Sequence, residues 1–504
     1  MTPDANPGRD LKVKLLHFEY TPPIVTERLA LLFILPGRIA APALEASLGN
    51  LLQLYPTAAG RLQREGDGVC IFCSGAGVPV TVLEAPEVDW DAVQQQARQF
   101  LLQHTQDINI AAMRRGRDAL MKVQITHCGT SHTLLGVTVA HVLADVAGIV
   151  LMLTSWVRLH RGETVKAPCF SRDIFRPPTP DKAKSCIANE VPQPSPRLHC
   201  PSLDMKRQIY RPKRSVAQLG ATARGFLTFG LQLCTQGALC RMETVVLHIP
   251  PTSLARLKAQ INALQPAGSE PLSANDVLTS LLRHAVRQVR GLPYDQDTLG
   301  SRWVGLLFNM RQVHVPADYF GNGSIVLYVP GQPKATARAP HSATLSNKHC
   351  CVSHSSYLQH GTIDHAEEVL RAVASTACDI RQAVVAARRP EVLAQMAGLL
   401  LSHGSASRTT RLRSRLMEVA TYDAHLASWD DLYRAVGQLD FGMGAATHLL
   451  CQKLADDIEP WTGWWGRHAQ SGDAYLHVMV PPVKVRAFRR CPVWKSMLPG
   501  AQFL

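Results

Sequence analysis

The fold of this chain is decided by Thr133–Trp156, which read TLLGVTVAHVLADVAGIVLMLTSW. Leu134–Ala140 is a bounded apolar run rich in β-branched residues, and this pattern predicts a strand that is buried on both faces. Val146–Trp156 stays apolar over the length of a helix, so we expect a helix to follow the strand. His141 and Asp145 therefore lie where the strand becomes a helix.

An imidazole and a carboxylate are costly to place in such an apolar setting unless each has a partner or a chemical task. The same His-x-x-x-Asp spacing occurs twice more, in polar or turn-forming surroundings, at His314–Asp318 and His360–Asp364. Only the first instance follows a predicted buried strand. We therefore regard this junction as the candidate site of the chemistry.

The length and composition indicate a soluble globular protein with two domains, because 504 residues exceed what one hydrophobic core usually supports. The apolar run 133–157 has two ionisable residues near its centre, which favours a buried core over a membrane span. The net charge of +14 favours a polyanionic partner, such as nucleic acid, an anionic membrane or a phosphate-bearing small molecule. Basic and aromatic residues are not interleaved, so we expect a phosphorylated co-substrate rather than nucleic acid.

The 13 cysteines show no regular spacing, and the sequence has no signal-peptide pattern, so we expect reduced thiols and a cytoplasmic location. Cys70 and Cys73 lie in a predicted strand, where residues three apart point to opposite faces. The His/Cys group at 349–354 lies in a polar loop and contains adjacent cysteines, which is a poor zinc pattern. We expect no metal.

Periodicity predicts most elements of the first domain, residues 1–178. The predicted strands are Leu11–Tyr20, Leu29–Leu35, two short segments within Arg61–Leu83, Leu120–Thr126 and Leu134–Ala140. The predicted helices are Ala41–Leu54 and Trp90–Leu102. Residues 179–240 are rich in proline and poor in sustained apolar patterns, which indicates a crossover linker.

The second predicted domain, residues 241–504, also alternates strands and helices, which indicates the α/β class. The predicted strands are Glu243–Ile249, Trp303–Phe308, Ser324–Val329 and Ala474–Val480. The predicted helices are Pro251–Ile261, Ser273–Val289 and His365–Ala387. Ser273 is the expected N-cap of its helix, with Asp276 completing an acidic variant of the capping box.

Two motifs of this chain resemble those of the BAHD acyltransferases, the acyl-CoA-dependent transferases best known from plant specialised metabolism. The family's His-x-x-x-Asp-Gly, at the end of a central strand, reads HVLADV at 141–146, with the family's Ser-Trp kept at 155–156. Its distal Asp-Phe-Gly-Trp-Gly reads DFGMG at 440–444. Shorter matches fall in the family's order at 55–62, 123–126, 172–178, 309–311 and 319–322.

The resemblance implies a fold of two chloramphenicol-acetyltransferase-like domains, each a mixed β-sheet flanked by helices, joined by a long crossover loop. It implies transfer of an acyl group from acyl-CoA to the hydroxyl or amine of a small molecule by a monomer without a permanently bound cofactor. A neutral imidazole, with an ordinary pKa of about 6.5, is suited to take the acceptor's proton, so His141 is the expected general base. No serine or cysteine lies in a nucleophile elbow, so we expect direct attack without an acyl-enzyme.

Asp145 admits two interpretations. It could orient His141 as in a catalytic triad, or it could pair with an arginine away from the pocket, as the resemblance implies, with Arg311 at the matching position. We favour the second, structural role, because side chains on either side of a strand-to-helix turn can diverge.

The resemblance also gives the distal motif a role in shaping the CoA channel, remote from the chemistry. The residues concerned are Asp440, Phe441, Gly442 and Gly444. Ser273 begins a helix that matches one near CoA in the family, although ordinary helix capping explains this serine equally well. Asp430 and Asp431 follow Trp429, where a carboxylate would repel an acidic acceptor.

Two departures from the family pattern leave an alternative open. Val146 replaces the glycine that follows the motif aspartate, and Met443 replaces the tryptophan of the distal motif. They motivate the hypothesis of a non-catalytic acyl-CoA-binding or regulatory descendant. Nonribosomal condensation domains share the first motif, but they usually carry a second histidine where this chain has Ala140, and they lack the distal motif.

Overall fold

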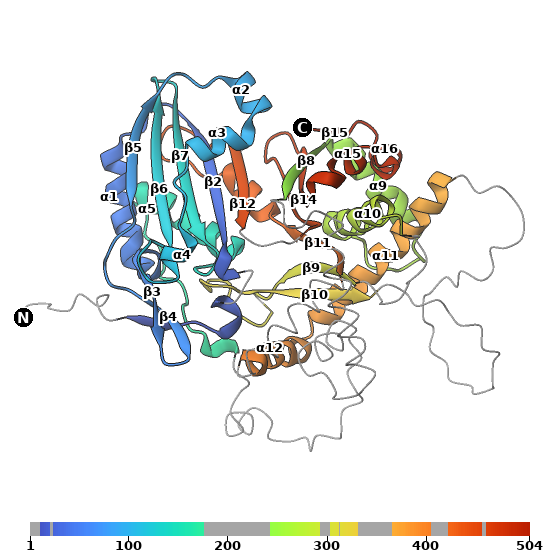
Figure 1. The fold of residues 1–504 in the computed structure, drawn as a ribbon, viewed down its shortest axis with the longest axis horizontal. Coiled ribbons are helices and arrows are strands. Elements are labelled where there is room, and N and C mark those ends of the chain that lie inside the picture. The colour runs from blue at the N-terminus through green and yellow to red at the C-terminus, as the bar shows by residue number, and fades with distance from the viewer. Residues whose placement is uncertain are drawn as a thin grey trace, which may run out of the picture.

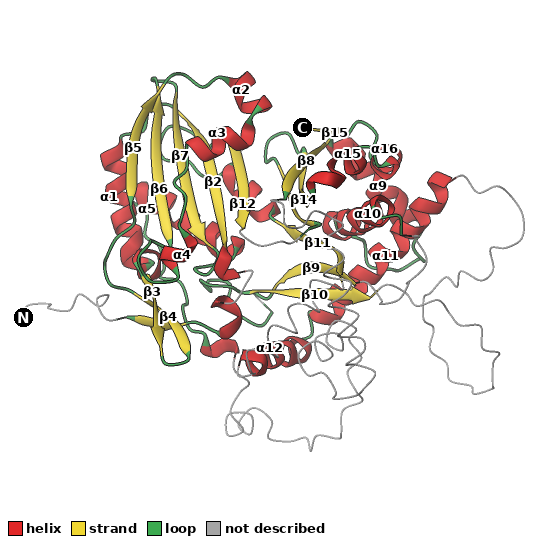
Figure 2. Cartoon of the chain, viewed as in Figure 1, coloured by secondary structure: helices red, strands yellow, loops and turns green. Residues whose placement is uncertain are grey.

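The computed structural model describes residues 11–20, 24–175, 242–292, 303–311, 313–330, 365–404, 422–455 and 460–504. The predicted crossover linker, the His/Cys group at 349–354 and His360–Asp364 lie outside these residues. The described chain forms two large mixed sheets with helices packed on them, and a small three-stranded sheet (Figures 1 and 2). The predicted α/β class, with two mixed sheets flanked by helices, is confirmed.

The first large sheet has five strands in the order β12-β2-β7-β6-β5. Their bounds are β12 His448–Ala455, β2 Glu27–Pro36, β7 His132–Ala140, β6 Met121–Cys128 and β5 Val80–Ala85. All neighbours are antiparallel except β5 and β6, which are parallel. The strand that the sequence predicted at its centre, β7, is paired on both sides.

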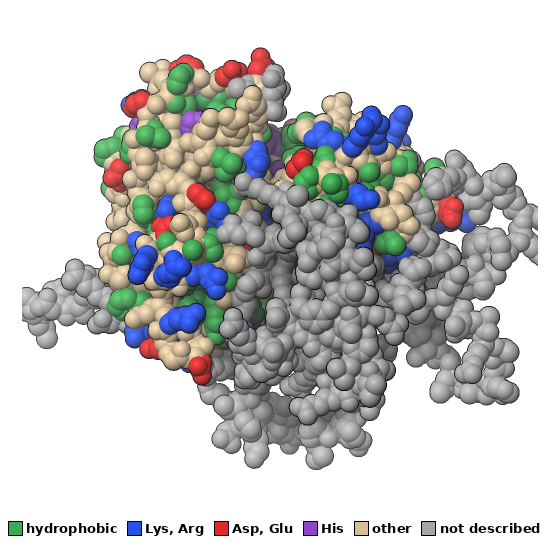
Figure 3. Space-filling model, in the orientation of Figure 1, with side chains coloured by type: hydrophobic (Ala, Val, Ile, Leu, Met, Phe, Trp, Pro, Cys, Tyr) green, Lys and Arg blue, Asp and Glu red, His purple; other side chains and the backbone are tan. Residues whose placement is uncertain are grey.

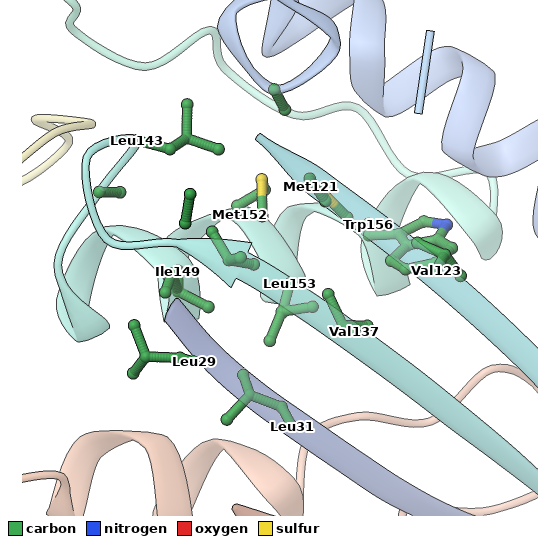
Figure 4. Close-up of a cluster of buried hydrophobic side chains, with 14 of the residues drawn as sticks. Leu29, Leu31, Met121, Val123, Val137, Leu143, Ile149, Met152, Leu153 and Trp156 are labelled. Atoms are coloured by element: carbon green, nitrogen blue, oxygen red, sulfur yellow. The ribbon is translucent and has the colours of Figure 1, made fainter. Parts of the chain in front are cut away.

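Both faces of this sheet are covered, as the continuous apolar runs predicted. Leu29 and Leu31 of β2 pack with β7 and helix α5, as the close-up in Figure 4 shows, whereas Leu32 faces the opposite layer with Leu101 of α3. The helices of this domain are α1 Ala41–Leu54, α2 Trp90–Gln95, α3 Ala97–Gln103, α4 Ile110–Met113 and α5 Val146–His160.

The second large sheet has seven strands in the order β10-β9-β11-β13-β14-β8-β15. The bounds are β10 Ser324–Pro330, β9 Trp303–Asn309, β11 Tyr422–Ser428, β13 Thr462–Arg467, β14 Ala474–Val480, β8 Glu243–Ile249 and β15 Gln502–Phe503. β11 runs parallel to both neighbours, and the other pairs are antiparallel.

The helices of the C-terminal half include all three that the sequence predicted. Their bounds are α9 Pro251–Ala263, α10 Ala274–Val289, α11 His365–Ala387, α12 Pro390–Gly404, α14 Asp430–Val436, α15 Val485–Arg489 and α16 Pro492–Met497. Buried residues of α9, α10, α11, α15 and α16 form one core cluster with β8 and β14.

The two halves of the chain share one core. β12 comes from the C-terminal half but completes the N-terminal sheet by pairing with β2 from His448↔Ile34 to Ala455↔Glu27. Trp464 of β13 is buried in the same cluster as Val137 of β7. A division of the chain near residue 240 therefore separates the two sheets except at β12.

Two predicted elements of the N-terminal half differ in extent. The strand expected at Leu11–Tyr20 is only β1 (Lys12–Lys14), followed by a 3-10 helix that buries the Glu19 carboxylate against Arg172. β1 joins β4 (Gly68–Phe72) and β3 (Arg61–Glu65) in the small sheet. The helix expected at Trp90–Leu102 is interrupted at Gln96, whose backbone leaves the helical region (φ −131°, ψ 38°).

Candidate active site

His141 lies in the turn between β7 and α5, and its main chain is fixed from two sides. Its N–H donates to the Glu27 carbonyl oxygen at 2.9 Å, and its carbonyl oxygen accepts from Nδ2 of Asn322 at 3.1 Å. The side chain is half-buried, and its Nδ1 is buried without a hydrogen-bond partner among the described residues. The protein thus holds the backbone and leaves the imidazole uncommitted.

Asp145 begins α5 and is 5% exposed. Its Oδ1 accepts from Gly148 N–H at 2.9 Å and from Arg311 Nη2 at 2.9 Å. Its Oδ2 accepts from Arg311 Nη1 at 3.0 Å, Gly323 N–H at 2.9 Å and Ser324 Oγ at 2.8 Å. These donors occupy both oxygens, so the carboxylate is committed to the β9–β10 loop and not to His141.

The electrostatics of Asp145 follow from these contacts. Burial alone would raise its pKa, but the Arg311 charge and the hydrogen bonds from Arg311, Gly148 and Ser324 outweigh burial and hold the pKa below its ordinary value. The pair joins the β7–α5 turn to a loop of the other sheet. Arg311 also donates to the Tyr319 carbonyl at 3.1 Å and the Gly321 carbonyl at 3.0 Å, which organises that loop.

A second buried ion pair lies beside the first. Arg172 donates to Glu19 at 3.1 Å, and these side chains are 7% and 0% exposed. The guanidinium carbons of Arg172 and Arg311 lie 5.5 and 5.6 Å from the centre of the Tyr319 ring, so this ring contacts two cations. In the sequence, 172–178 and 319–322 stand out only as family matches, and nothing around Glu19 indicates its partner.

Val146 requires no unusual turn. Gly148 and Val146 both lie inside α5, and the only described non-glycine residue with positive φ is Trp461. Gly148 is needed for close approach instead, because a Cβ there would lie 2.9 Å from the Ala144 Cβ and 3.4 Å from Arg311 Nη2. The glycine missing from position 146 is therefore not required by the backbone geometry of this junction.

The distal motif forms a tight turn beside the C-terminal end of α5. Asp440 Oδ1 accepts from the N–H groups of Gly442 at 2.8 Å and Gly444 at 2.9 Å. The Phe441 ring packs against Trp156 and His160 of α5, with centroids 5.5 and 5.2 Å apart. The turn thus contacts the helix that follows the site.

Met443, at the position of the family's tryptophan, is 52% exposed and lies over Gly37, where a Cβ would meet its Cε at 2.5 Å. The Gly37 N–H donates to the Ser131 carbonyl oxygen at 2.7 Å, next to the start of β7, whereas His141 follows the end of that strand. The replacement of the family's tryptophan by Met443 therefore changes the outer face of the turn.

Gly442 gives a direct test of this turn, because its φ is +93°. Gly442→Ala is expected to lower the free energy of unfolding by about 1–3 kcal/mol, since a side chain strains this conformation. Gly49→Ala in α1 is the matched control, because a Cβ meets no atom within 4 Å at either position and Gly49 lies inside a helix. Denaturant unfolding of both variants measures the difference, and an equal effect would contradict the role of φ.

Ser273 caps α10, as predicted. Its hydroxyl accepts from Asp276 N–H at 3.2 Å, while the Asp276 carboxylate accepts from Ser273 N–H at 2.7 Å and also pairs with Arg381. The serine thus has a complete structural role, and its proposed contact with CoA rests on the resemblance alone.

The carboxylates after Trp429 do not offer the free negative charge expected from the sequence. Asp430 is buried and accepts from Arg467 Nε at 3.0 Å and Nη2 at 2.5 Å, and Asp431 is paired with Arg434. Each carboxylate is thus paired with an arginine, and the repulsion of an acidic acceptor stays a prediction.

The cysteine pattern gives no metal site in the part of the chain that the structure describes, where no group of three His, Cys, Asp or Glu side chains could hold an ion. Cys70 and Cys73 are both buried and free. Burial raises the pKa of the Cys73 thiol to about 11, which favours the unreactive thiol form.

Comparison with known proteins identifies the family and the fold of this chain. A model of the family described as "Transferase family" matches residues 34–387. A hydroxycinnamoyltransferase of Narcissus pseudonarcissus is 33% identical over 149 residues, which are 28% of this chain and 33% of that protein. Spermidine hydroxycinnamoyltransferase 1 of Oryza sativa subsp. japonica is 25% identical over 295 residues, 51% of this chain and 64% of that protein.

The matched segments thus span about one third to two thirds of these relatives' lengths. Among solved structures, TRI101 of F. sporotrichioides, in complex with coenzyme A and T-2, superimposes with a TM-score of 0.64 at 13% identity. The superposition covers 97% of this chain and 99% of TRI101, which shows a common fold.

Proposed function

This chain belongs to the Transferase family, that of the BAHD-type acyltransferases, and on this premise we propose that it transfers an acyl group from acyl-CoA to the hydroxyl or amine of a small molecule. One observation carries the proposal. His141 is fixed through its main chain, while Asp145, its sequence partner, is committed to Arg311. The imidazole is therefore held in place and remains available for proton transfer. The coenzyme A bound in TRI101 supports the class of donor.

In the proposed reaction, His141 removes the acceptor's proton as the hydroxyl or amine attacks the thioester carbonyl carbon. The tetrahedral intermediate collapses, the carbon–sulfur bond breaks, and the proton on the imidazole passes to the leaving CoA thiolate. The neutral imidazole is thereby restored, and no bond forms between protein and acyl group. The residues of the chain bind and orient the two substrates and move one proton.

Asn322 is the residue we assign to positioning the base. Its side chain is 2% exposed, and its Nδ2 holds the His141 carbonyl at the point where the chain leaves β7. Asn322→Ala is expected to lower kcat by up to about tenfold, because one net hydrogen bond contributes about 0.5–1.5 kcal/mol. KM for acyl-CoA should stay unchanged, because Asn322 acts on the main chain of the base, His141.

Asn262→Ala is the control for this variant, because its side chain also bonds main-chain groups, Leu272 N–H at 3.0 Å and the Lys258 carbonyl at 2.8 Å. It should reduce stability without lowering kcat. Equal kcat values for the two variants, measured at saturating substrates, would contradict a positioning role for Asn322.

The relatives' names guide the choice of substrates. The two relatives described above are named hydroxycinnamoyltransferases, and one name specifies spermidine. We infer that a hydroxycinnamoyl-CoA is the first donor to test, with polyamines and hydroxylated small molecules as acceptors. Asp430 and Asp431 give no reason to exclude acidic acceptors, because both are paired with arginines.

The test is a panel of acyl-CoA donors crossed with alcohol and amine acceptors, with free CoA and acylated product both measured. Acceptor-dependent release of CoA, with one equivalent of product, is the expected result. Tight binding of acyl-CoA without turnover across the panel would overturn the proposal in favour of the non-catalytic alternative raised by Val146 and Met443.

A further inference from the structure

The C-terminal end of the described chain carries an unusual charge distribution. Residues 251–264 and 481–504 together contain no aspartate or glutamate side chain. The two segments carry seven basic residues, Arg256, Lys258, Lys484, Arg486, Arg489, Arg490 and Lys495. We call these two segments the C-terminal basic surface. The proposed acyl transfer does not account for it.

The two segments are neighbours in space. Ser253 at the start of α9 donates to the main-chain oxygen of Pro499, which follows α16. A Cβ on Gly500 would lie 3.7 Å from both Pro250 and Ser253. In the space-filling view, Lys and Arg side chains gather over α15 and α16 (Figure 3). The two segments that carry the basic residues therefore lie side by side.

Several of these charges are uncompensated. Arg256, Arg486, Arg490 and Lys495 are exposed, and none takes part in an ion pair within the described ranges of the chain. Asp473, which follows Gly472 beside Pro251, is already paired with His248 at 3.1 Å. The surface therefore presents a net positive charge to the solvent.

Apolar side chains protrude among these cations, while the aromatic ones point inward. Val483 is 65% exposed and Leu504 is 59% exposed. Phe488 and Trp494 are 1% and 3% exposed and pack against each other, with ring centroids 5.3 Å apart. Because no large aromatic ring of α15 or α16 is free to stack on a base, the pattern does not suit nucleic acid.

We propose that the C-terminal basic surface docks the protein on the face of an anionic lipid bilayer. Clustered lysines and arginines are attracted to negatively charged headgroups, and exposed apolar side chains enter the boundary between headgroups and acyl chains. Docking would be peripheral: within the described residues, no helix has both the length and the apolarity to cross a membrane. This inference is independent of the acyl-transfer proposal.

The test is sedimentation of the full chain with phosphatidylcholine vesicles that contain or lack phosphatidylserine. We expect binding only to the anionic vesicles, and weaker binding as salt is raised. Replacing Arg486, Arg490 and Lys495 together by glutamate should reduce the partition coefficient on the order of a hundredfold or more. Val483→Ser should reduce it by a smaller factor without changing the net charge.

The matched control replaces Arg114, Arg115 and Arg117 by glutamate, which changes the net charge equally on the N-terminal half. These residues are also exposed. An equal loss of vesicle binding in both triple variants would show attraction by bulk charge alone and would overturn the proposal. Binding of the protein to a short DNA duplex but not to vesicles would also overturn the proposal, because the surface would then serve nucleic acid. A rise in KM for acyl-CoA in the C-terminal variant would overturn it too, because the surface would then serve the co-substrate.

Discussion

His141→Ala is expected to lower acceptor-dependent acyl transfer by roughly 10²–10⁴-fold, because an alcohol or amine must lose its proton as it attacks the thioester. The affinity for acyl-CoA and the melting temperature should change little. The main-chain bonds from Glu27 and Asn322, which fix this turn, do not involve the imidazole. Steady-state kinetics, thermal unfolding and binding of a non-reactive CoA thioether together separate the lost chemistry from lost structure.

His132→Ala is the matched control, because this half-buried histidine begins the strand that His141 follows. Nine residues of strand place the two rings on the order of 30 Å apart. Its ring contacts Trp90 and Ser131 and has no contact with the site. Equal losses of turnover in the two variants would contradict the assignment of the base.

Asp145→Asn is expected to lower the free energy of unfolding by about 3–5 kcal/mol, because it leaves the buried Arg311 guanidinium without its counter-charge. Both side chains are less than a tenth exposed. Activity should fall along with stability, since the pair holds the β9–β10 loop whose Asn322 touches the His141 main chain. A loss of activity in a protein that unfolds like wild type would favour the triad interpretation.

Asp318→Asn is the control for this variant, because Asp318 also forms an ion pair, with Lys166 at 2.8 Å, but Lys166 is 86% exposed. Solvent-exposed pairs contribute at most about 1 kcal/mol. In denaturant unfolding, the loss of free energy should therefore be severalfold larger for Asp145→Asn than for Asp318→Asn.

The low pKa of Asp145 also predicts how stability depends on pH. A carboxyl group whose folded pKa lies below its unfolded value of about 3.9 stabilises the protein above that value. Its contribution is lost as pH falls from there through the folded pKa. The stability difference between wild type and Asp145→Asn should thus be complete at neutral pH and shrink below about pH 4. A stability difference that grows on acidification would contradict a lowered pKa of Asp145.

Local patterns predicted the elements that bear the site. The apolar run before His141 and the apolar helix after it appear as β7 and α5, and the capping box at Ser273 is present as expected. The ion pair of Asp145 with Arg311 was placed by family resemblance, since the residues are 166 positions apart. Periodicity alone carries no information on such distant contacts.

The missed features depend on contacts across the chain. β12 was not predicted, although it completes the N-terminal sheet, because its pairing with β2 joins residues more than 400 positions apart. Glu19 and Asp430 also depend on distant partners. Glu19 is buried against Arg172, and the charge of Asp430 is compensated by Arg467. For Glu19 the sequence suggested an extended segment and for Asp430 a free charge, and in both cases a distant partner determined the outcome.

The proposed mechanism is best tested by a single turnover, with enzyme in excess over acyl-CoA and the free thiol followed in time. Direct attack with His141 as the base predicts no release of CoA without acceptor, rapid release when acceptor is added, and a rate reduced by roughly 10²–10⁴-fold in His141→Ala. Release of CoA without acceptor, with the acyl group left on the protein, would contradict direct attack. An unchanged rate in His141→Ala would contradict His141 as the base.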